Sequence, residues 1–184
     1  MPDPHTYVAL LRGINVAGHK TVRMADVRGL LTGLGFTNVQ SVLQSGNLVF
    51  LGDRRSSRAL ERLLETEAAK RLGLETDFLV RTAEEWAAVI AKNPFPKDAE
   101  RDPARLLVQF LSDAPSAKDV HALQAAITGL EVMRVNGRHA YIVYPNGVGR
   151  SRLTTALIES KLGTRGTGRN WNTVLRLGAL AGKG

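Results

Sequence analysis

The 184-residue sequence contains no cysteine, which excludes disulfides, thiolate metal sites and cysteine nucleophiles. It also lacks any run of the roughly 18 apolar residues that a membrane-spanning helix needs. Its N-terminus, MPDPHTYVALLRG, has neither the basic start nor the long apolar stretch of a signal peptide. From these absences we expect a cytoplasmic protein that does not associate with membranes.

Common catalytic and metal-binding patterns are missing too. The four histidines, at positions 5, 19, 121 and 139, show no i,i+3 or i,i+4 spacing and no accompanying carboxylate cluster. A metal site is therefore not expected, and no cofactor is indicated. There is no Gly-x-Ser-x-Gly nucleophile motif, and no loop carries the paired carboxylates of a glycosidase.

The sequence does contain an uneven excess of positive charge. The formal net charge is +8, while the hydrophobic fraction of 43% is normal for a globular protein. Residues 145–184 carry seven lysines and arginines against one acidic residue, Glu159. Such a local field suggests an anionic partner, either nucleic acid or a phosphorylated small molecule. The alternative is a general effect of basic composition on solubility.

The first half of the chain alternates apolar runs of strand length with helical periodicity. Its pattern predicts strands at 5–11, 39–43, 47–51 and 76–80, and helices at 24–34, 57–72 and 82–91. Thr82 followed by Glu85 is a capping-box signature for the last of these helices. A stretch with three prolines and five charges, residues 93–103, then indicates a boundary. We therefore expect two domains, residues 1–96 and 97–184.

The second half repeats this order of elements. It predicts strands at 106–111, 132–135 and 140–144, a short extended piece near Thr167, and helices at 116–127, 151–162 and 171–180. The dipeptide Asn136-Gly137 indicates a hairpin between its second and third strands. Each half thus reads βαββαβ followed by an extra helix. This order predicts an α+β protein with two ferredoxin-like subdomains in tandem.

The strongest candidate site is the stretch YPNGVGRSRLTT, residues 144–155. It is not an ATP-binding P-loop, because Tyr144 stands where the first glycine is needed and Arg150 where the lysine is needed. A glycine-rich turn before a helix nevertheless favours an anion, and Ser151 is the expected N-cap. Arginines in a first helical turn oppose the helix dipole, which suggests a nearby ligand phosphate or a carboxylate of the protein itself. The candidate residues are Gly147, Gly149, Arg150, Ser151 and Arg152. The alternative is an ordinary capped turn with solvated arginines.

Two further basic stretches are candidates for the same kind of site. Residues 163–173 contain three glycines, two arginines and several hydrogen-bonding side chains. In this stretch Asn170 or Asn172 could cap the last helix, and Trp171 could either stack on a base or pack in the core. The stretch 12–20 leaves the first strand and is also basic and glycine-bearing. The candidate anion-binding residues of these two stretches are Arg12, Asn15, Arg165, Arg169, Asn170 and Asn172. The polar turn 44–47 is better explained by its own backbone needs.

Four segments together resemble a known family. LLRGINVAG, LQSGNLVF, YPNGVGRSRLT and LGTRGTGRNWNTV are similar, in this order, to motifs of the bacterial domain-of-unknown-function family 1697. The resemblance spans about residues 5–181. It implies two ferredoxin-like subdomains and no established activity, substrate or catalytic residue. The sequence departs from the expected pattern at Ala17, where a second glycine is expected, and at Arg152, where lysine is usual.

Three functions remain open at this point. The first is a binding module for an anionic, phosphate-bearing ligand, such as nucleic acid, held by the arginines of the C-terminal half. The second is an enzyme acting on a phosphorylated small metabolite, with Ser151, Asn15 or Asn172 orienting the substrate. The third is a structural or protein-interaction module in which the arginines pair with the protein's own carboxylates.

Overall fold

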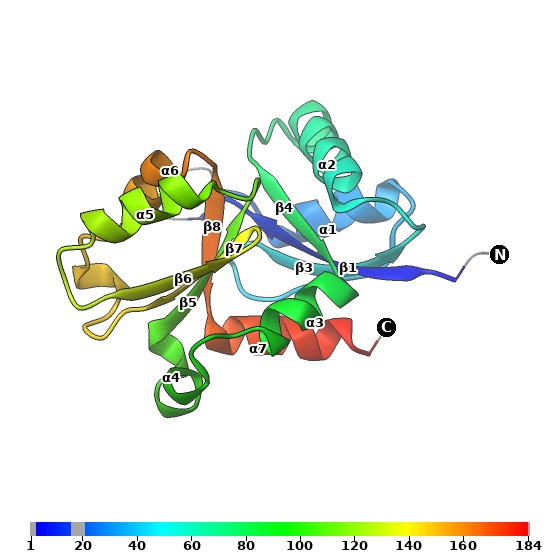
Figure 1. The fold of residues 1–184 in the computed structure, drawn as a ribbon. Coiled ribbons are helices and arrows are strands. Elements are labelled where there is room, and N and C mark those ends of the chain that lie inside the picture. Colours follow the sequence, from blue (N-terminus) through cyan, green and yellow to red (C-terminus); the bar gives the residue numbers. More distant parts are fainter. Residues whose placement is uncertain (1–2, 16–20, 184) are drawn as a thin grey trace. The chain divides into compact units, whose positions relative to one another are not determined.

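The computed structural model describes residues 3–15 and 21–183 and contains two four-stranded antiparallel sheets, each flanked by helices (Figure 1). The predicted α+β class with two ferredoxin-like subdomains is confirmed. The chain divides into two compact units, Met1–Ala88 with Arg176–Gly184, and Val89–Leu175. No helix in the described ranges is both long and apolar enough to cross a membrane.

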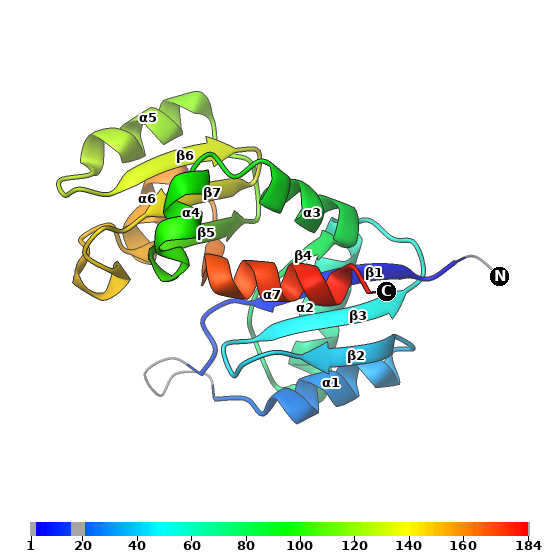
Figure 2. The same cartoon turned by 90° about the horizontal axis from the view of Figure 1, so that it is seen from below.

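The first unit is built on a sheet with the order β2-β3-β1-β4, seen face-on in Figure 2. Its elements are β1 (His5–Leu11), α1 (Met24–Gly33), β2 (Thr37–Ser41), β3 (Asn47–Gly52), α2 (Ser57–Leu72), β4 (Phe78–Thr82) and the first part of α3 (Ala83–Ala91). Because side chains alternate along a strand, Tyr7, Ala9 and Leu11 of β1 all point to one face. There they join the core that α1 and α2 cover.

The second unit has the same strand order, β6-β7-β5-β8. Its elements are α4 (Pro96–Arg101), η1 (Pro103–Arg105), β5 (Leu106–Leu111), α5 (Ala117–Ala126), β6 (Val132–Asn136), β7 (His139–Val143), η2 (Val148–Arg150), α6 (Thr155–Leu162), β8 (Gly166–Asn170) and the first part of α7 (Trp171–Ala181). Helices α5 and α6 cover the face that carries Met133, Ala140 and Ile142. Helix α4 lies on the opposite side of this sheet (Figure 1).

Several helix ends follow the chemistry expected from the sequence. The capping box that starts α3 is confirmed, because the Glu85 N–H donates to Thr82 Oγ1 at 3.1 Å and the Thr82 N–H donates to Glu85 Oε2 at 2.8 Å. Ser116 caps α5 in the same way through the Asp119 N–H. Gly163 ends α6 in the left-handed conformation that glycine adopts without a steric penalty.

The start of α6 differs from the prediction. The helix begins at Thr155, and its N-cap is Thr154, whose hydroxyl accepts a hydrogen bond from the Leu157 N–H. Ser151 is not the cap, because its hydroxyl is held by a carboxylate elsewhere in the unit. The arginines at 150 and 152 consequently precede the first helical turn, and the argument that they oppose the dipole of that helix does not apply.

The proline-rich stretch predicted as a boundary is folded. Pro96 starts α4 and Pro103 starts η1, positions where the missing N–H of proline costs no hydrogen bond. Residues 89–105 belong to the second compact unit, and the division between the units, at Ala88/Val89, falls inside α3. The same division falls inside α7 between Leu175 and Arg176. The domain boundary at 96/97 stays a prediction. Prolines here stiffen short helices and do not mark a linker.

Candidate functional site

The turn after β7 is organised around a carboxylate of the protein. Ser151 Oγ donates to Glu131 Oε1 at 2.6 Å and accepts from the Leu153 N–H at 3.0 Å. Tyr144, at the end of β7, donates from its hydroxyl to the Leu153 carbonyl. Burial, and then the charge of Glu131, raise the pKa of Tyr144, so this tyrosine stays neutral near pH 7.

Two arginines of the turn line the same surface hollow as this carboxylate. Arg150 and Arg152 are exposed and line a hollow of about 310 Å³ together with Glu131 and Ser151. Gly147 and Gly149 belong to the same turn, and Gly147 adopts a positive φ of 82°. The structure therefore brings the candidates at 147–152 together in one turn. The sequence predicted either a ligand phosphate or a protein carboxylate near the arginines, and Glu131 is a protein carboxylate in the same hollow.

A second, more open hollow of about 590 Å³ lies beside the first. It is lined by Arg105, Asn146 and Arg150. Arg105 reaches this place because β5 and β7 pair antiparallel, with Leu106 opposite Val143, so β5 begins where β7 ends. The sequence analysis missed Arg105 and Asn146. The ferredoxin-like order of elements implies that β5 pairs with β7. That pairing could have predicted that Arg105, just before β5, lies near Asn146, just after β7.

Arg105 is held in one orientation by two contacts. Its Nε lies 3.2 Å from Asp102 Oδ2, and its Nη1 donates to the carbonyl of Pro145. The backbone carbonyl of Arg105 in turn accepts from the Tyr144 N–H at 2.9 Å. Neither side-chain contact uses Nη2. The Arg105–Asp102 pair is about half exposed, so it contributes little to stability.

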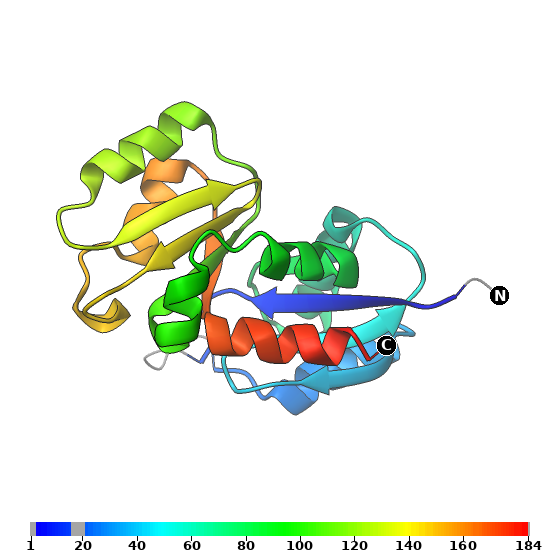
Figure 3. The same ribbon diagram turned by 60° about the horizontal axis from the view of Figure 1, so that its bottom comes forward.

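An apolar hollow of about 400 Å³ adjoins the basic one and shares Arg105 with it. Its lining consists of Phe95, Asp98, Arg101, Asp102, Arg105, Val132, Val143 and Pro145. The helix α4 stands over the sheet face that carries the two valines (Figure 3). This hollow was not predicted from the sequence, because half of its lining comes from residues 93–103, the stretch interpreted as a domain boundary.

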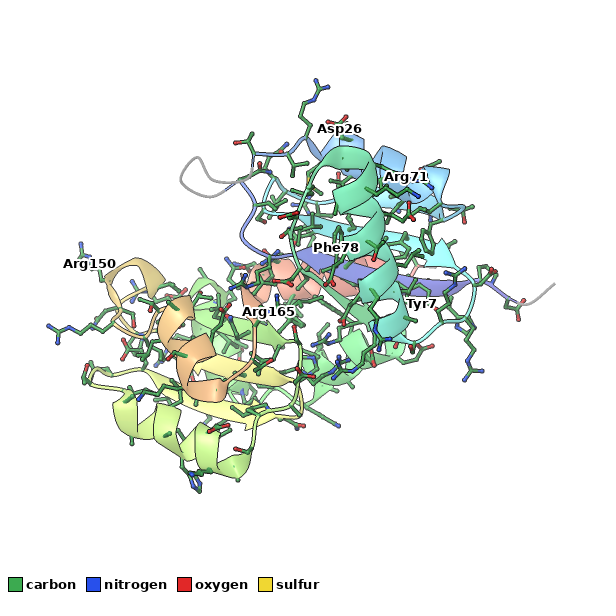
Figure 4. The ribbon with its side chains drawn as sticks, turned by 90° about the horizontal axis from the view of Figure 1, so that it is seen from above. Tyr7, Asp26, Arg71, Phe78, Arg150 and Arg165 are labelled. Carbon is green, nitrogen blue, oxygen red and sulfur yellow. The ribbon has the colours of Figure 1, made fainter. Side chains whose placement is uncertain are left out.

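Arg165 lies apart from the turn at 147–152. Strands β7 and β8 both pair antiparallel with β5, so the residue before β8 and the turn after β7 lie at opposite ends of the sheet. Figure 4 shows Arg150 and Arg165 well separated within the second unit. Arg165 lines its own open hollow, with Ser112, Asp113 and Glu159 among its neighbours.

Arg169 is buried within β8. Its Nη1 donates to Thr167 Oγ1 at 2.7 Å and to the Gly168 carbonyl at 2.9 Å, and burial lowers its pKa to about 10, which leaves it charged at neutral pH. Arg81 occupies the corresponding place in the first sheet, since it lies opposite Val8 as Arg169 lies opposite Val108. Arg81 is also buried, and its Nη1 donates to the preceding carbonyl. Arg169 therefore lies inside its unit with local hydrogen-bond partners, as Arg81 does in the first unit.

The residues after Arg169 start α7. Asn170 Oδ1 accepts from the Thr173 N–H at 3.0 Å, as expected of an N-cap. Trp171 is 5% exposed, so a base could stack on it only after the surrounding side chains moved. Asn172 is exposed on the first turn of the helix. None of the three lines the hollows around Arg150 that are described above.

The candidates of the first unit hold its loops together. Arg12 Nη1 lies 3.3 Å from Asp77 Oδ2. Asn15 donates from Nδ2 to the Gln44 carbonyl at 2.7 Å, and its Oδ1 accepts from the Val22 N–H at 2.9 Å. Both residues therefore have local structural partners. The rest of that stretch, residues 16–20 with Ala17, lies outside the described residues.

The polar turn at 44–47 is explained by backbone needs. Gly46 has a φ of 85°, and a Cβ there would lie 2.8 Å from Ile14 Cδ1 and 2.9 Å from Leu11 Cβ. Asn47 is fully buried and donates from Nδ2 to the Val42 carbonyl at 2.7 Å. Within the described part of the chain, no group of three His, Asp or Glu side chains is placed to hold a metal ion.

Comparison with known proteins now bears on identity. The family model described as "Protein of unknown function (DUF1697)" matches residues 5–141, about three quarters of the sequence. The chain belongs to the DUF1697 family. Among curated proteins nothing matches it.

A solved structure supports the fold of this DUF1697 protein. The chain is similar to the conserved bacterial protein SP0830 from Streptococcus pneumoniae, with 25% sequence identity and a TM-score of 0.75. The likeness covers 97% of this chain and 99% of the other. The family match contains Arg105 and Glu131 but ends before the turn at 145–153. The likeness to SP0830 extends over nearly the whole chain, and neither comparison names a ligand.

Proposed function

We propose that this DUF1697 protein binds a phosphate-bearing ligand through the surface formed by Arg105, Asn146 and Arg150. The observation that carries the proposal is that two arginines and one amide from separate segments line a single open hollow. Arginine guanidinium groups suit phosphate because they present several N–H donors in a fixed plane. Arg152 lies beside this surface and adds a further positive charge.

The geometry of Arg105 also supports phosphate binding. Its contacts with Asp102 and Pro145 fix the guanidinium before any ligand arrives, so little side-chain entropy is lost on binding. Arg150 is exposed and precedes Ser151, which is anchored by Glu131. One arginine is thus held rigidly while the other extends from an anchored turn.

The glutamate beside the arginines limits the ligand. Glu131 lies in the neighbouring hollow with Arg150 and Arg152 and partly offsets their charge. This favours a compact ligand with one phosphate near Arg105 and Arg150 over a long backbone that follows all the arginines. Arg165 and Arg169 contribute little in this proposal, since one lies at the far end of the sheet and the other is buried.

Thermal unfolding with inorganic phosphate tests the proposal. A ligand that binds only the folded state raises the melting temperature as its concentration rises. Sodium phosphate should therefore stabilise the protein relative to sodium chloride of equal ionic strength. Arg105→Ala and Arg150→Ala should each abolish that difference, while Lys118→Ala, which removes an exposed charge on α5, should preserve it.

The proposal is wrong if phosphate and chloride stabilise the wild type equally, or if the difference survives in both arginine variants. Arg165→Ala is a second comparison, because it tests the basic stretch at the other end of the sheet. Loss of the phosphate effect in Arg165→Ala alone would move the site to the hollow beside Glu159.

A further inference from the structure

The apolar hollow beside Arg105 indicates that the ligand of the second unit carries an apolar group in addition to its phosphate. The hollow has a volume of about 400 Å³, within the range of about 300–1,000 Å³ that is usual for small-molecule sites. Phe95, Val132, Val143 and Pro145 give it apolar walls. Val132 is 42% exposed although it is a large apolar residue in a strand, so a ligand that covered it would remove apolar surface from water.

The basic and apolar hollows meet at Arg105. This side chain lines both of them, and Pro145 of the apolar wall is followed directly by Asn146 of the basic one. A single ligand can therefore contact both, provided that one end is anionic and the other is a compact apolar or aromatic group. Inorganic phosphate would occupy only the basic hollow, which Arg105, Asn146 and Arg150 line.

The paired charges at the rim of the apolar hollow indicate the direction in which such a ligand lies. Asp98 and Asp102 border the apolar hollow, and each pairs with an arginine, Arg101 at 2.9 Å and Arg105 at 3.2 Å. These pairs leave the rim without an excess of positive charge, whereas the basic hollow is lined by two arginines and no carboxylate, so a phosphate is held better in the basic hollow. A ring with amino groups can instead donate hydrogen bonds to the aspartates, whereas an alkyl chain would desolvate them without giving a donor.

From this arrangement we infer that the ligand is a nucleotide with an amino-bearing base, whose ring lies between Phe95 and Val132 and whose phosphate contacts Arg105 and Arg150. The inference rests on the proposed phosphate site and adds the ring. Two sources share this chemistry: a free mononucleotide and the 5′-phosphorylated end of a strand. The flat base suits a hollow walled by an aromatic ring, a proline and two valines.

Calorimetric titration with three related compounds tests the inference. AMP carries ring and phosphate, ribose 5-phosphate carries the phosphate without the ring, and adenosine carries the ring without the phosphate. We expect AMP to bind about tenfold more tightly than ribose 5-phosphate, because the ring buries apolar surface. Adenosine should bind more weakly than AMP by a similar factor, because it loses the charge-assisted contacts.

Two variants separate the halves of the site. Val132→Gln should lower AMP affinity to that of ribose 5-phosphate and leave ribose 5-phosphate unchanged, since it adds no charge. Leu43→Gln is the matched control, because Leu43 is also exposed and lies in the first unit. Arg150→Ala should weaken both phosphate compounds about tenfold or more and adenosine hardly at all.

The outcomes distinguish the two proposals. Equal affinity of AMP and ribose 5-phosphate, with both lost in Arg150→Ala, overturns the nucleotide inference and keeps the phosphate site. Binding of adenosine as tight as that of AMP overturns the phosphate site. The ligand is a strand end if a 5′-phosphorylated oligonucleotide binds as tightly as AMP while the same oligonucleotide with a 5′-hydroxyl binds more weakly. The ligand is a free nucleotide if both oligonucleotides bind more weakly than AMP.

Discussion

The hydroxyl of Ser151 donates a 2.6 Å hydrogen bond to the carboxylate of Glu131, a residue twenty positions earlier in the chain. This bond determines the shape of the basic turn, since it removes Ser151 from the start of α6 and leaves the capping position to Thr154. It also places a negative charge in the hollow that Arg150 and Arg152 line. The turn thus has an internal carboxylate on one side and the open hollow lined by Arg105, Asn146 and Arg150 on the other.

Neutralising that carboxylate should strengthen anion binding. Glu131→Gln removes a negative charge close to Arg150, so phosphate affinity should rise about twofold to fivefold at low salt, with a smaller gain at high salt. Titration calorimetry with AMP at two salt concentrations measures this effect. Glu84→Gln, an exposed glutamate at the start of α3, is the control for net charge. A fall in affinity would show that Glu131 is needed to hold the site in shape.

The side chain of Gln109 offers a test of polar burial. It is fully buried, and neither its Nε2 nor its Oε1 has a hydrogen-bond partner among the described residues. Gln109→Met keeps the length of the side chain and removes the unsatisfied groups, so the free energy of unfolding should rise by about 1–3 kcal/mol. Urea unfolding measures it, with the exposed Gln40→Met as control. A loss of stability would show that the carboxamide is hydrogen-bonded in solution, for instance by a buried water.

Alanine substitutions at two glycines of the first unit can distinguish the cost of backbone strain from the cost of a steric clash. Gly13 and Gly46 both have positive φ, but a Cβ at position 13 meets nothing within 4 Å, whereas one at position 46 lies within 3 Å of Ile14 and Leu11. Gly13→Ala should cost about 1–2 kcal/mol of unfolding free energy from backbone strain alone. Gly46→Ala should cost about 1–3 kcal/mol more. Equal losses in chemical denaturation would mean that the turn at 44–47 relaxes around the methyl group.

Tyr141 predicts a pH dependence of stability. Burial raises its pKa from 10.0 to about 12 in the folded protein, and its hydroxyl donates to the Val89 carbonyl. The unfolded state therefore loses this proton first as pH rises, so the contribution of Tyr141 to stability is retained below pH 10 and lost between pH 10 and about 12. Tyr141→Phe should cost about 1 kcal/mol at neutral pH and make the alkaline fall shallower. An unchanged fall in urea unfolding between these pH values would contradict the assignment.

Much of the fold could be predicted because it depends on local patterns. Short apolar runs located most of the strands, and Thr82 with Glu85 marked the start of α3 correctly. The start of α6 could not be predicted, because Ser151 and Thr154 are both good caps. The choice between them depends on Glu131, which the fold brings close.

Only part of the candidate site could be predicted from the sequence, because some of its residues come together only in the folded chain. The exposed arginines of the turn are local features, but Arg105 joins them through the pairing of β5 with β7. Arg169 has the same charge as Arg150 and a different environment, since it lies inside the fold beside Thr167. Sequence alone records charge, whereas burial is set by which face of the sheet the side chain occupies.

The most direct test of the account is an NMR titration of the ¹⁵N-labelled protein with AMP. We predict that the largest shifts fall on the backbone amides of Asn146 and Arg150, on the Arg105 side chain and on Val132, and that they disappear in Arg150→Ala. Shifts centred on Arg165 and Ser112, or no shifts at low salt, would contradict the claim that the β7 end of the second sheet binds a phosphate-bearing ligand.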